Sequence, residues 1–287
     1  MTAAITKLTH LGALLVSGPD ARQFLQGQLT ADVNSLTSER ILLAACNSPQ
    51  GRVQAVLWLI ERPEGIVLLV ARELLETTTT RLRRYILRAK VTVDTSALRV
   101  GLLDDATSGD PGVDRTHRLE GSTSLLRWSG HRHALVVTPD DITAEDADRE
   151  LRWRAEHLRA GLPQVYSATH ERFVAQMLNL DLLGGISFTK GCYTGQEIIA
   201  RAHYRGTVKR RMFHFRAPCA APAPGTLVTA GDQHAGDVVD AIATASGCEL
   251  LAVINLAQLD ERLRLEGIDD SALERLPLPY DVGAPQS

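Results

Sequence analysis

The sequence lacks the features that define several common protein classes. Aromatic residues make up 5% of its 287 positions, and its four cysteines form neither a C-x-x-C pair nor the cysteine and histidine spacing of a zinc or cluster site. No stretch approaches the ~18 uninterrupted apolar residues of a membrane helix, and no basic start precedes a long apolar run. These absences predict a cytoplasmic protein in a reducing compartment, with no membrane span and no metal held by a recognisable motif.

Three motifs of common enzyme families are also missing. There is no G-x-G-x-x-G, no G-x-x-x-x-G-K-[ST] and no G-x-S-x-G, so nicotinamide-dependent, P-loop and serine-hydrolase chemistry have no support. The 31 basic and 34 acidic side chains give a net charge of -3, which argues against indiscriminate binding to nucleic acid. With 44% hydrophobic and 23% charged residues, the chain is expected to be globular, with two or three domains.

Short apolar runs alternate with amphipathic stretches, which predicts a mixed α+β fold. The turn Asn47-Ser-Pro-Gln-Gly51 between two apolar runs predicts a β-hairpin. A helix is expected to begin at Thr143 and to end before Gly161. Strands are expected at 11–17, 40–46, 52–60, 66–71, 91–93, 124–128 and 133–138, and helices at 20–30, 74–88 and 143–160.

The chain is expected to divide into two domains, residues 1–206 and 207–287. Within the first, the loop-like composition of residues 104–114 predicts a boundary between two lobes. In the second, a stretch rich in proline and alanine at 217–225 is followed by short β-branched runs separated by turns. This pattern predicts a small antiparallel β-barrel or sheet at the end of the chain.

The residues with the clearest chemistry lie in the glycine-rich stretch 184–201. Thr194-Gly-Gln-Glu197 has the form of a capping box, which predicts that a helix begins near Thr194. Cys192 would then precede a helix N-terminus, whose free N–H groups and positive dipole favour a thiolate, and Lys190 favours it further. The pattern predicts a reactive cysteine. The plain structural alternative is a small buried side chain in a glycine-rich turn.

The octapeptide Lys190-Gly-Cys-Tyr-Thr-Gly-Gln-Glu197 resembles the signature of the YgfZ family. These folate-binding proteins are related to mitochondrial iron-sulfur assembly factors and, more distantly, to the glycine cleavage T-protein. Segments 26–33, 49–52, 85–91, 176–180 and 201–211 resemble the family in the same order, so the resemblance covers residues 8–216. It implies a three-lobed, T-protein-like α+β fold. Two intertwined ferredoxin-like lobes and a C-terminal antiparallel β-barrel would surround a central folate-binding opening.

The same resemblance implies a function. Relatives bind tetrahydrofolate and support the assembly or repair of iron-sulfur enzymes, and so influence tRNA thiolation. The implied partners are therefore iron-sulfur client enzymes, such as tRNA-thiolating enzymes. The family's functional cysteine corresponds to Cys192, and Trp153 matches a tryptophan that stacks on folate. The other expected site residues are Lys190 beside the thiol, Tyr193, Gln196, Gln176 and Asn179 as cofactor contacts, and Gly191, Thr194, Gly195, Glu197 and Arg201 as signature positions.

Two positions depart from the family pattern. Leu11 stands where a second tryptophan can occur, and Arg159 stands where T-protein relatives place a pterin-binding carboxylate. Some of the expected site residues also have plain structural alternatives. Trp153 would pack on one face of an amphipathic helix, and the amides of Gln176 and Asn179 would satisfy backbone groups in a turn.

Histidine and arginine clusters have similar alternatives. His131 and His133 are expected on one face of a strand, where they more often form a surface pair than a metal site, because two ligands are too few. Arg81, Arg83, Arg84 and Arg88 are explained as one helix face, although such a cluster would also suit the anionic tail of a polyglutamyl folate.

Two other functions stay open. One is a tetrahydrofolate-dependent one-carbon (aminomethyl) transferase resembling T-protein, against which Arg159 and Cys192 argue. The other is a tRNA-binding module, because residues 201–216 carry six basic side chains, three aromatic ones and no acid. The plain alternative for that stretch is a solvated helix end and strand.

Overall fold

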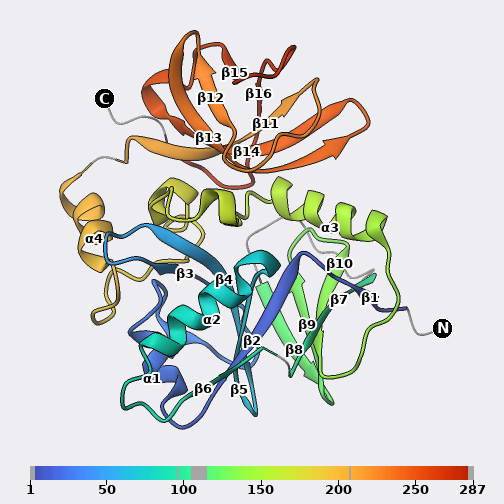
Figure 1. Cartoon of the computed structure of the whole chain (residues 1–287), viewed down its shortest axis with the longest axis vertical. Helices are drawn as coiled ribbons and strands as arrows, with labels where there is room; N and C mark the ends of the chain where they lie inside the picture. Colours follow the sequence, from blue (N-terminus) through green and yellow to red (C-terminus); the bar gives the residue numbers. More distant parts are fainter. Residues whose placement is uncertain (1–3, 96, 105–114, 207, 284–287) are drawn as a thin grey trace.

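This computed structural model describes residues 4–95, 97–104, 115–206 and 208–283, and within them it contains four α-helices and three antiparallel sheets (Figure 1). The predicted mixture of α and β structure is confirmed. Of the loop predicted at 104–114, residues 105–114 lie outside the described residues. The helices are α1 (Ala21–Gln26), α2 (Leu75–Arg84), α3 (Ala147–Arg159) and α4 (Gln196–Arg205).

The first sheet carries the strands nearest to the signature stretch. β3 and β4 pair antiparallel, with Leu42 opposite Leu59, so the hairpin predicted around residues 47–51 is confirmed. The sheet has the order β3-β4-β5-β2-β6. Its strands are β2 (Leu11–Ser17), β3 (Leu42–Asn47), β4 (Val53–Arg62), β5 (Gly65–Ala71) and β6 (Thr92–Asp94).

The second sheet is interleaved with the first along the chain. Its edge strand β1 precedes β2, yet β1 pairs with β7, with Thr6 opposite Leu102. The chain therefore begins in the second sheet, builds the first, and then returns. The order is β1-β7-β10-β9-β8, made of β1 (Thr6–Lys7), β7 (Arg99–Asp104), β8 (Arg115–Glu120), β9 (Thr123–Trp128) and β10 (His133–Thr138).

The third sheet contains the C-terminal strands and packs its own apolar core. Its pairing order leaves β15 and β16 at opposite edges, so the described strands form a curled open sheet where a closed barrel was expected (Figure 1). The order is β15-β12-β13-β14-β11-β16, made of β11 (Arg210–Ala217), β12 (Leu227–Ala230), β13 (Gln233–Thr244), β14 (Gly247–Asn255), β15 (Leu263–Leu265) and β16 (Glu274–Leu276).

Helix α3 lies between the third sheet and the two others (Figure 1). Its buried side chains, Trp153 among them, join the core shared by the first two sheets. On the other side, Arg154 pairs with Asp240 of β13 at 3.0 Å and Arg159 with Glu249 of β14 at 2.7 Å. This helix therefore connects all three sheets.

Several helix ends differ from the prediction. The start at Thr143 is wrong, because the side chain of Asp146 accepts the Arg149 N–H and caps the first turn of α3. The predicted end is confirmed, with Gly161 in the left-handed region at φ 66°. α1 ends at Gln26, although the apolar spacing predicts a helix up to residue 30. No helix among the described residues is long and apolar enough to cross a membrane.

Candidate functional site

The signature stretch lies where segments far apart in the sequence meet. The Thr30 hydroxyl accepts the Ala45 N–H at 2.8 Å and donates to the Gly185 carbonyl at 2.6 Å, so it joins the loop after α1 to β3 and to residue 185. Further along, the Thr194 N–H donates to the Gly27 carbonyl at 3.3 Å. Segment 26–33 and the stretch 184–201, which contains the signature octapeptide, thus form one hydrogen-bonded unit.

Lys190 fixes the loop that follows α1. Its ammonium donates to the carbonyls of Gln26, Leu29 and Ala31 at 2.6, 2.9 and 2.7 Å. These three bonds use all three N–H donors of the ammonium, so none is left for the Cys192 sulfur. Removal from water lowers the pKa of Lys190 to about 8, against the opposing effect of the Asp32 carboxylate. In a helix continued to residue 30 the Gln26 carbonyl would accept the Thr30 N–H, whereas here it accepts the Lys190 ammonium and the Thr30 N–H donates to the Ala45 carbonyl.

Gly195 sets the turn into α4. It adopts φ 81°, and a Cβ at this position would lie 2.6 Å from the Ser48 carbonyl and 2.9 Å from Gly51 Cα. The backbone therefore crosses the β3–β4 turn at a distance that only glycine permits. The capping box predicted at Thr194 is wrong, since Gly195 is the N-cap residue and no side chain caps the helix. Gln196 instead accepts the Tyr193 N–H at 3.3 Å, and Glu197 lies in the first turn.

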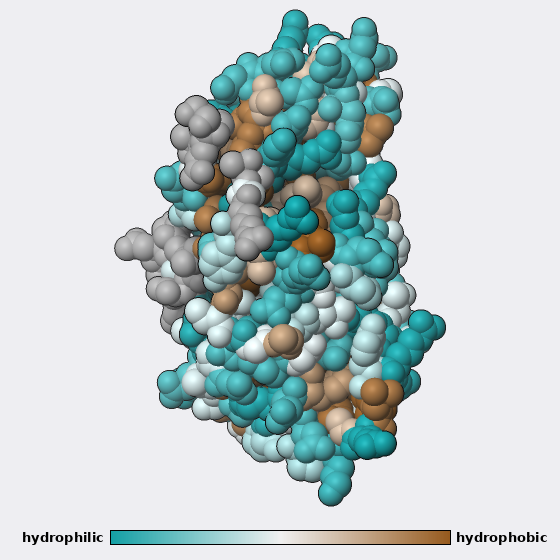
Figure 2. All heavy atoms as spheres, turned by 90° about the vertical axis from the view of Figure 1, so that its left-hand side faces the viewer, coloured by the Kyte–Doolittle hydropathy of each residue, from teal (hydrophilic) through white to brown (hydrophobic). Residues whose placement is uncertain are grey.

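Cys192 is exposed, so the alternative of a buried thiol is wrong. Gly191 before it is also exposed, and a Cβ there would meet nothing within 4 Å. The first helical residue is Gln196, four positions later, which is further from the thiol than the sequence predicts. The face that carries α4 is mostly hydrophilic, with apolar atoms in scattered patches (Figure 2). The thiol is therefore reachable by another molecule.

Gln176 and Asn179 support the backbone around this unit. Gln176 donates to the Ile199 carbonyl at 2.7 Å, and Asn179 donates to the Met212 carbonyl at 2.8 Å. This agrees with the plain structural alternative for both amides. Each side chain keeps one buried oxygen without a partner in the described structure. Their contact with a folate, like that of Tyr193 and Gln196, stays a prediction.

Trp153 lies in a buried aromatic cluster. Its indole is 1% exposed, stacks on His157 at 4.7 Å between ring centroids, and meets His10 edge-on at 6.3 Å. His157 also contacts the two other tryptophans, Trp58 at 5.4 Å and Trp128 at 5.5 Å. A ligand that stacks directly on Trp153 would have to displace one of these rings. In the described structure, the indole nitrogens of all three tryptophans and both ring nitrogens of His157 are buried without hydrogen-bond partners.

A cavity of about 520 Å³ lies beside this cluster, between α3 and the β9–β10 turn. Glu156 and Arg159 of α3 line it together with His131, whose ring packs 5.6 Å from that of His157. Arg159 binds both oxygens of Glu249, at 2.8 and 2.7 Å. Leu11, the other departure from the family pattern, is 1% exposed and belongs to the shared core.

The prediction that His131 and His133 form a surface pair on one strand is wrong. Both are buried, and only His133 belongs to β10, because the β9–β10 turn includes His131. Nδ1 of His133 lies 3.0 Å from Glu156, which gives the imidazole a carboxylate partner inside the protein. Among the described residues, no group of three or more His, Cys, Asp or Glu side chains is arranged to hold a metal ion.

The basic stretch 201–216 is partly neutralised. Arg211 binds Asp181 at 2.6 Å and Arg216 binds Glu274 at 2.6 Å. Phe213 and Phe215 are core residues of the third sheet, and Tyr204 alone of the three aromatic residues is largely exposed. Arg201 is exposed and pairs with no acid in the described chain. The stretch therefore offers fewer free cations and rings to RNA than its composition suggests.

Sequence reasoning missed His10, His157 and Glu156. His157 follows Trp153 by four residues, which places the two side chains on one face of a helix, so the spacing was a usable signal. His10 lies in a loop far from α3 in sequence and carried no such signal. No sequence pattern around Glu156 indicates that its carboxylate accepts the Arg132 N–H and that the residue lines a cavity.

The fold is that of a glycine cleavage T-protein. The crystal structure of the glycine cleavage system aminomethyltransferase T from Bartonella henselae matches with a TM-score of 0.73, over 100% of this chain and 88% of that one. At 13% sequence identity, the likeness shows a common fold alone.

The sequence identifies the family, although no family model matches it. The tRNA-modifying protein YgfZ of Enterobacter sp. (strain 638) is 32% identical over 294 residues, 93% of this chain and 90% of the relative. The same-named protein of Serratia proteamaculans is 31% identical over 305 residues, 97% of this chain and 92% of the relative. That of Escherichia fergusonii is 30% identical over 299 residues, 93% and 90% of the two chains. The chain belongs to the YgfZ family, as its signature octapeptide predicts.

Proposed function

We propose that this protein is a folate-binding accessory factor for the assembly or repair of iron-sulfur enzymes that act in tRNA modification, and that it works through the Cys192 thiol. The observation that carries the proposal is an exposed Cys192 between two fixed points, the Lys190 ammonium and the Gly195 turn. An exposed thiol in a fixed position suits chemistry on a second protein better than turnover of an enclosed metabolite. Membership in a family named for tRNA modification supports the tRNA context.

The cavity beside α3 is the best candidate for the folate. Its volume of about 520 Å³ suits a ligand of this size. Glu156 offers a carboxylate to the amino and ring N–H groups of a pterin, one helical turn before the position where T-protein relatives are expected to carry theirs. Arg152, which lines the same cavity, suits the glutamyl carboxylates. His131 lines the same cavity, and its buried Nε2 has no partner in the described structure, which fits a polar heterocycle. Trp153 would support this site from behind His157.

The T-protein-like fold fits a three-lobed arrangement. The two interleaved N-terminal sheets would be the ferredoxin-like lobes and the curled third sheet the last lobe, with the boundary at residues 206 and 207. The one-carbon transferase is the weaker candidate, because Arg159 stands at the position of the pterin carboxylate and is paired with Glu249. A cytoplasmic location follows from the proposed partners.

Complementation tests the accessory role. A bacterial strain that lacks its own YgfZ protein and shows reduced tRNA thiolation should regain thiolated tRNA when it expresses this chain. Mass spectrometry of the hydrolysed tRNA measures the modified nucleoside, and an immunoblot confirms that the protein is present. Thiolation that stays at the level of the empty vector, with normal amounts of protein, would contradict the proposal.

Calorimetry tests the folate site. Tetrahydrofolate should bind the wild type at one site, and Glu156→Gln should weaken binding at least ~10-fold, about 1.4 kcal/mol, because an amide accepts pterin N–H groups less strongly than a carboxylate. Glu150→Gln is the matched control. This variant removes the same charge from α3, but the Glu150 carboxylate lies outside the cavity and accepts the Thr9 N–H at 3.1 Å. Equal affinities for wild type and Glu156→Gln would place the folate elsewhere.

A further inference from the structure

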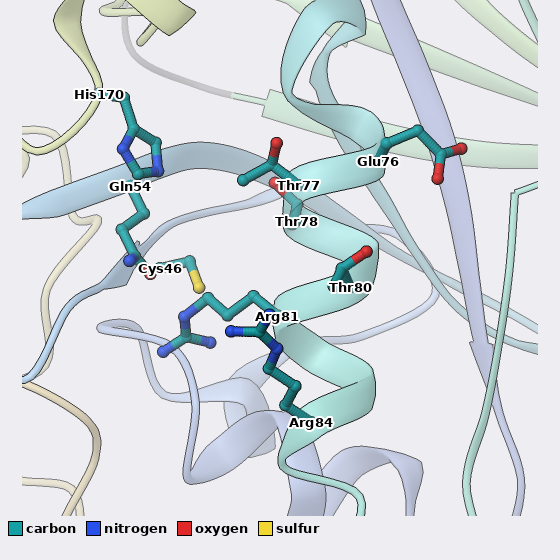
Figure 3. A pocket seen from close by; sticks show the side chains of 9 residues that line it. All are labelled: Cys46, Gln54, Glu76, Thr77, Thr78, Thr80, Arg81, Arg84 and His170. Carbon is teal, nitrogen blue, oxygen red and sulfur yellow. The ribbon is translucent and has the colours of Figure 1, made fainter.

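A second cavity, of about 380 Å³, lies against α2 on the first sheet (Figure 3). Its wall on one side is the helix, from Glu76 to Arg84. On the other side are Gln54 of β4 and His170, and the fully buried Cys46 of β3 also lines it. The cavity therefore reaches from the surface to the core of the sheet, and neither the Cys192 chemistry nor the proposed folate site uses it.

Two arginines give this cavity a positive charge. Arg81 and Arg84 are three residues apart on α2, and their guanidinium groups lie together on the side of Cys46 (Figure 3). Neither pairs with a carboxylate anywhere in the described ranges. The contacts of Arg81 are neutral: the Asn47 carbonyl at 2.8 Å, the Gln28 side chain at 3.3 Å and the ring of Tyr85. The carboxylate of Glu76 points away from both guanidinium groups (Figure 3). Two like charges held side by side favour an anion between them.

The remaining lining is rich in polar groups that can meet such an anion. Nε2 of His170 and Oε1 of Gln54 are buried and have no hydrogen-bond partner within the described residues. Thr77 and Thr78 of α2 also line this space. A buried polar atom without a partner destabilises the folded protein, so these groups gain from a ligand that supplies both acceptors and a donor.

We propose that this cavity binds a phosphate monoester of about the size of a mononucleotide. Planar guanidinium groups bind phosphate oxygens in pairs, and threonine hydroxyls and an imidazole add single donors to the same tetrahedral group. Gln54 Oε1 accepts a hydroxyl or amino group from the rest of the ligand. The volume is in the range of small-molecule sites and too small for a folded partner or a nucleic-acid duplex.

The position of the cavity connects it to the signature stretch. Arg81 binds the carbonyl of Asn47, which ends β3, and the side chain of Gln28, which lies in the loop after α1. The Thr194 N–H binds the Gly27 carbonyl, and Gly195 packs against Ser48. A ligand that holds Arg81 in place therefore stabilises the support of the Cys192 segment. The proposal does not depend on folate binding, and its test uses no folate.

Calorimetry with three probes tests the proposal: inorganic phosphate, adenosine 5′-monophosphate and adenosine. The monophosphate should bind at least ~10-fold more tightly than adenosine, since only it presents the dianion, and inorganic phosphate should compete with it. Arg84→Gln should weaken monophosphate binding by a similar factor, and Arg84→Lys should weaken it less, because lysine keeps the charge but loses the planar fork. Arg84 is exposed and has no partner in the described chain, so these variants should fold.

Arg83→Gln is the matched control. It removes one charge from the same helix, but Arg83 donates to the Val93 carbonyl at 2.7 Å and does not line the cavity. Its affinity for the monophosphate should equal that of the wild type. The proposal is overturned by equal affinities for adenosine and its monophosphate, by no heat with either phosphate, or by equal losses in Arg83→Gln and Arg84→Gln.

Discussion

A Cys192→Ser variant should fold like the wild type and fail to restore tRNA thiolation. Cys192 is exposed, and a serine at an exposed site changes the free energy of unfolding by no more than about 0.5 kcal/mol. The hydroxyl is a far weaker nucleophile than a thiolate, so the variant loses the chemistry and keeps the surface. Complementation of the strain without YgfZ measures the function, and urea denaturation measures the stability.

Cys219→Ser serves as the control and should complement fully. Cys219 is partly buried, and its sulfur lies 4.0 Å from that of Cys248. Burial, and to a smaller extent the contact with Cys219, raises the pKa of the Cys248 thiol to about 12. Iodoacetamide should therefore modify Cys192 before the three other cysteines of the wild type. Full complementation by Cys192→Ser would end the thiol mechanism and make the one-carbon transferase the leading candidate.

The protein should lose stability steeply below about pH 6.5. Burial lowers the pKa of His10 to about 3, with a further contribution from Arg154. Burial also lowers the pKa of His131 and holds that of His157 well below its usual value. The unfolded chain then binds more protons than the folded one, so the free energy of unfolding falls as the pH falls. A histidine that stays neutral in the folded protein contributes at most about 1.4 kcal/mol for each pH unit below about 6.5, the pKa of a histidine in the unfolded chain.

Urea denaturation at fixed ionic strength between about pH 7.5 and 5.5 measures the effect. His157→Phe keeps an aromatic ring in the stack and removes one titrating group, so its loss of stability should be smaller by about 1.4 kcal/mol. Burial also lowers the pKa values of His117 and His214, so these residues add to the same pH dependence. The comparison with the variant isolates the contribution of His157. A wild type and a His157→Phe variant with the same pH dependence would show that His157 becomes protonated in the folded state.

Local patterns predicted most of the elements, because they depend on neighbours in the chain. The apolar run at 11–17 became β2, and the turn at 47–51 became the β3–β4 hairpin. Helix starts were less predictable. Thr143 and Asp146 both resemble N-caps, and only the backbone geometry selects Asp146. At Thr194, the close approach of Gly195 to the β3–β4 turn overrides the capping box.

The candidate site was predictable in its residues and not in their contacts. The signature octapeptide pointed to Cys192, and the structure shows it exposed. The role of Lys190 depends on three carbonyls about 160 positions earlier in the chain, as the separations of 164, 161 and 159 residues show. The burial of Trp153 depends in the same way on His10, which belongs to another element. Long-range packing of this kind leaves no periodic trace in a sequence.

The interleaving of the two N-terminal sheets imposes an order on folding while the ribosome synthesises the chain. β1 cannot pair until β7 has been made, and the first sheet is therefore complete before the second can close. The surroundings of Cys192 come later still, because the Gln176 backbone carbonyl accepts a hydrogen bond from Arg211 of β11, and the Asn179 side chain donates one to the Met212 carbonyl of the same strand. A nascent chain that stalls before β11 carries the thiol without these supports. Prematurely ended chains should therefore compete poorly with the full protein for its partners.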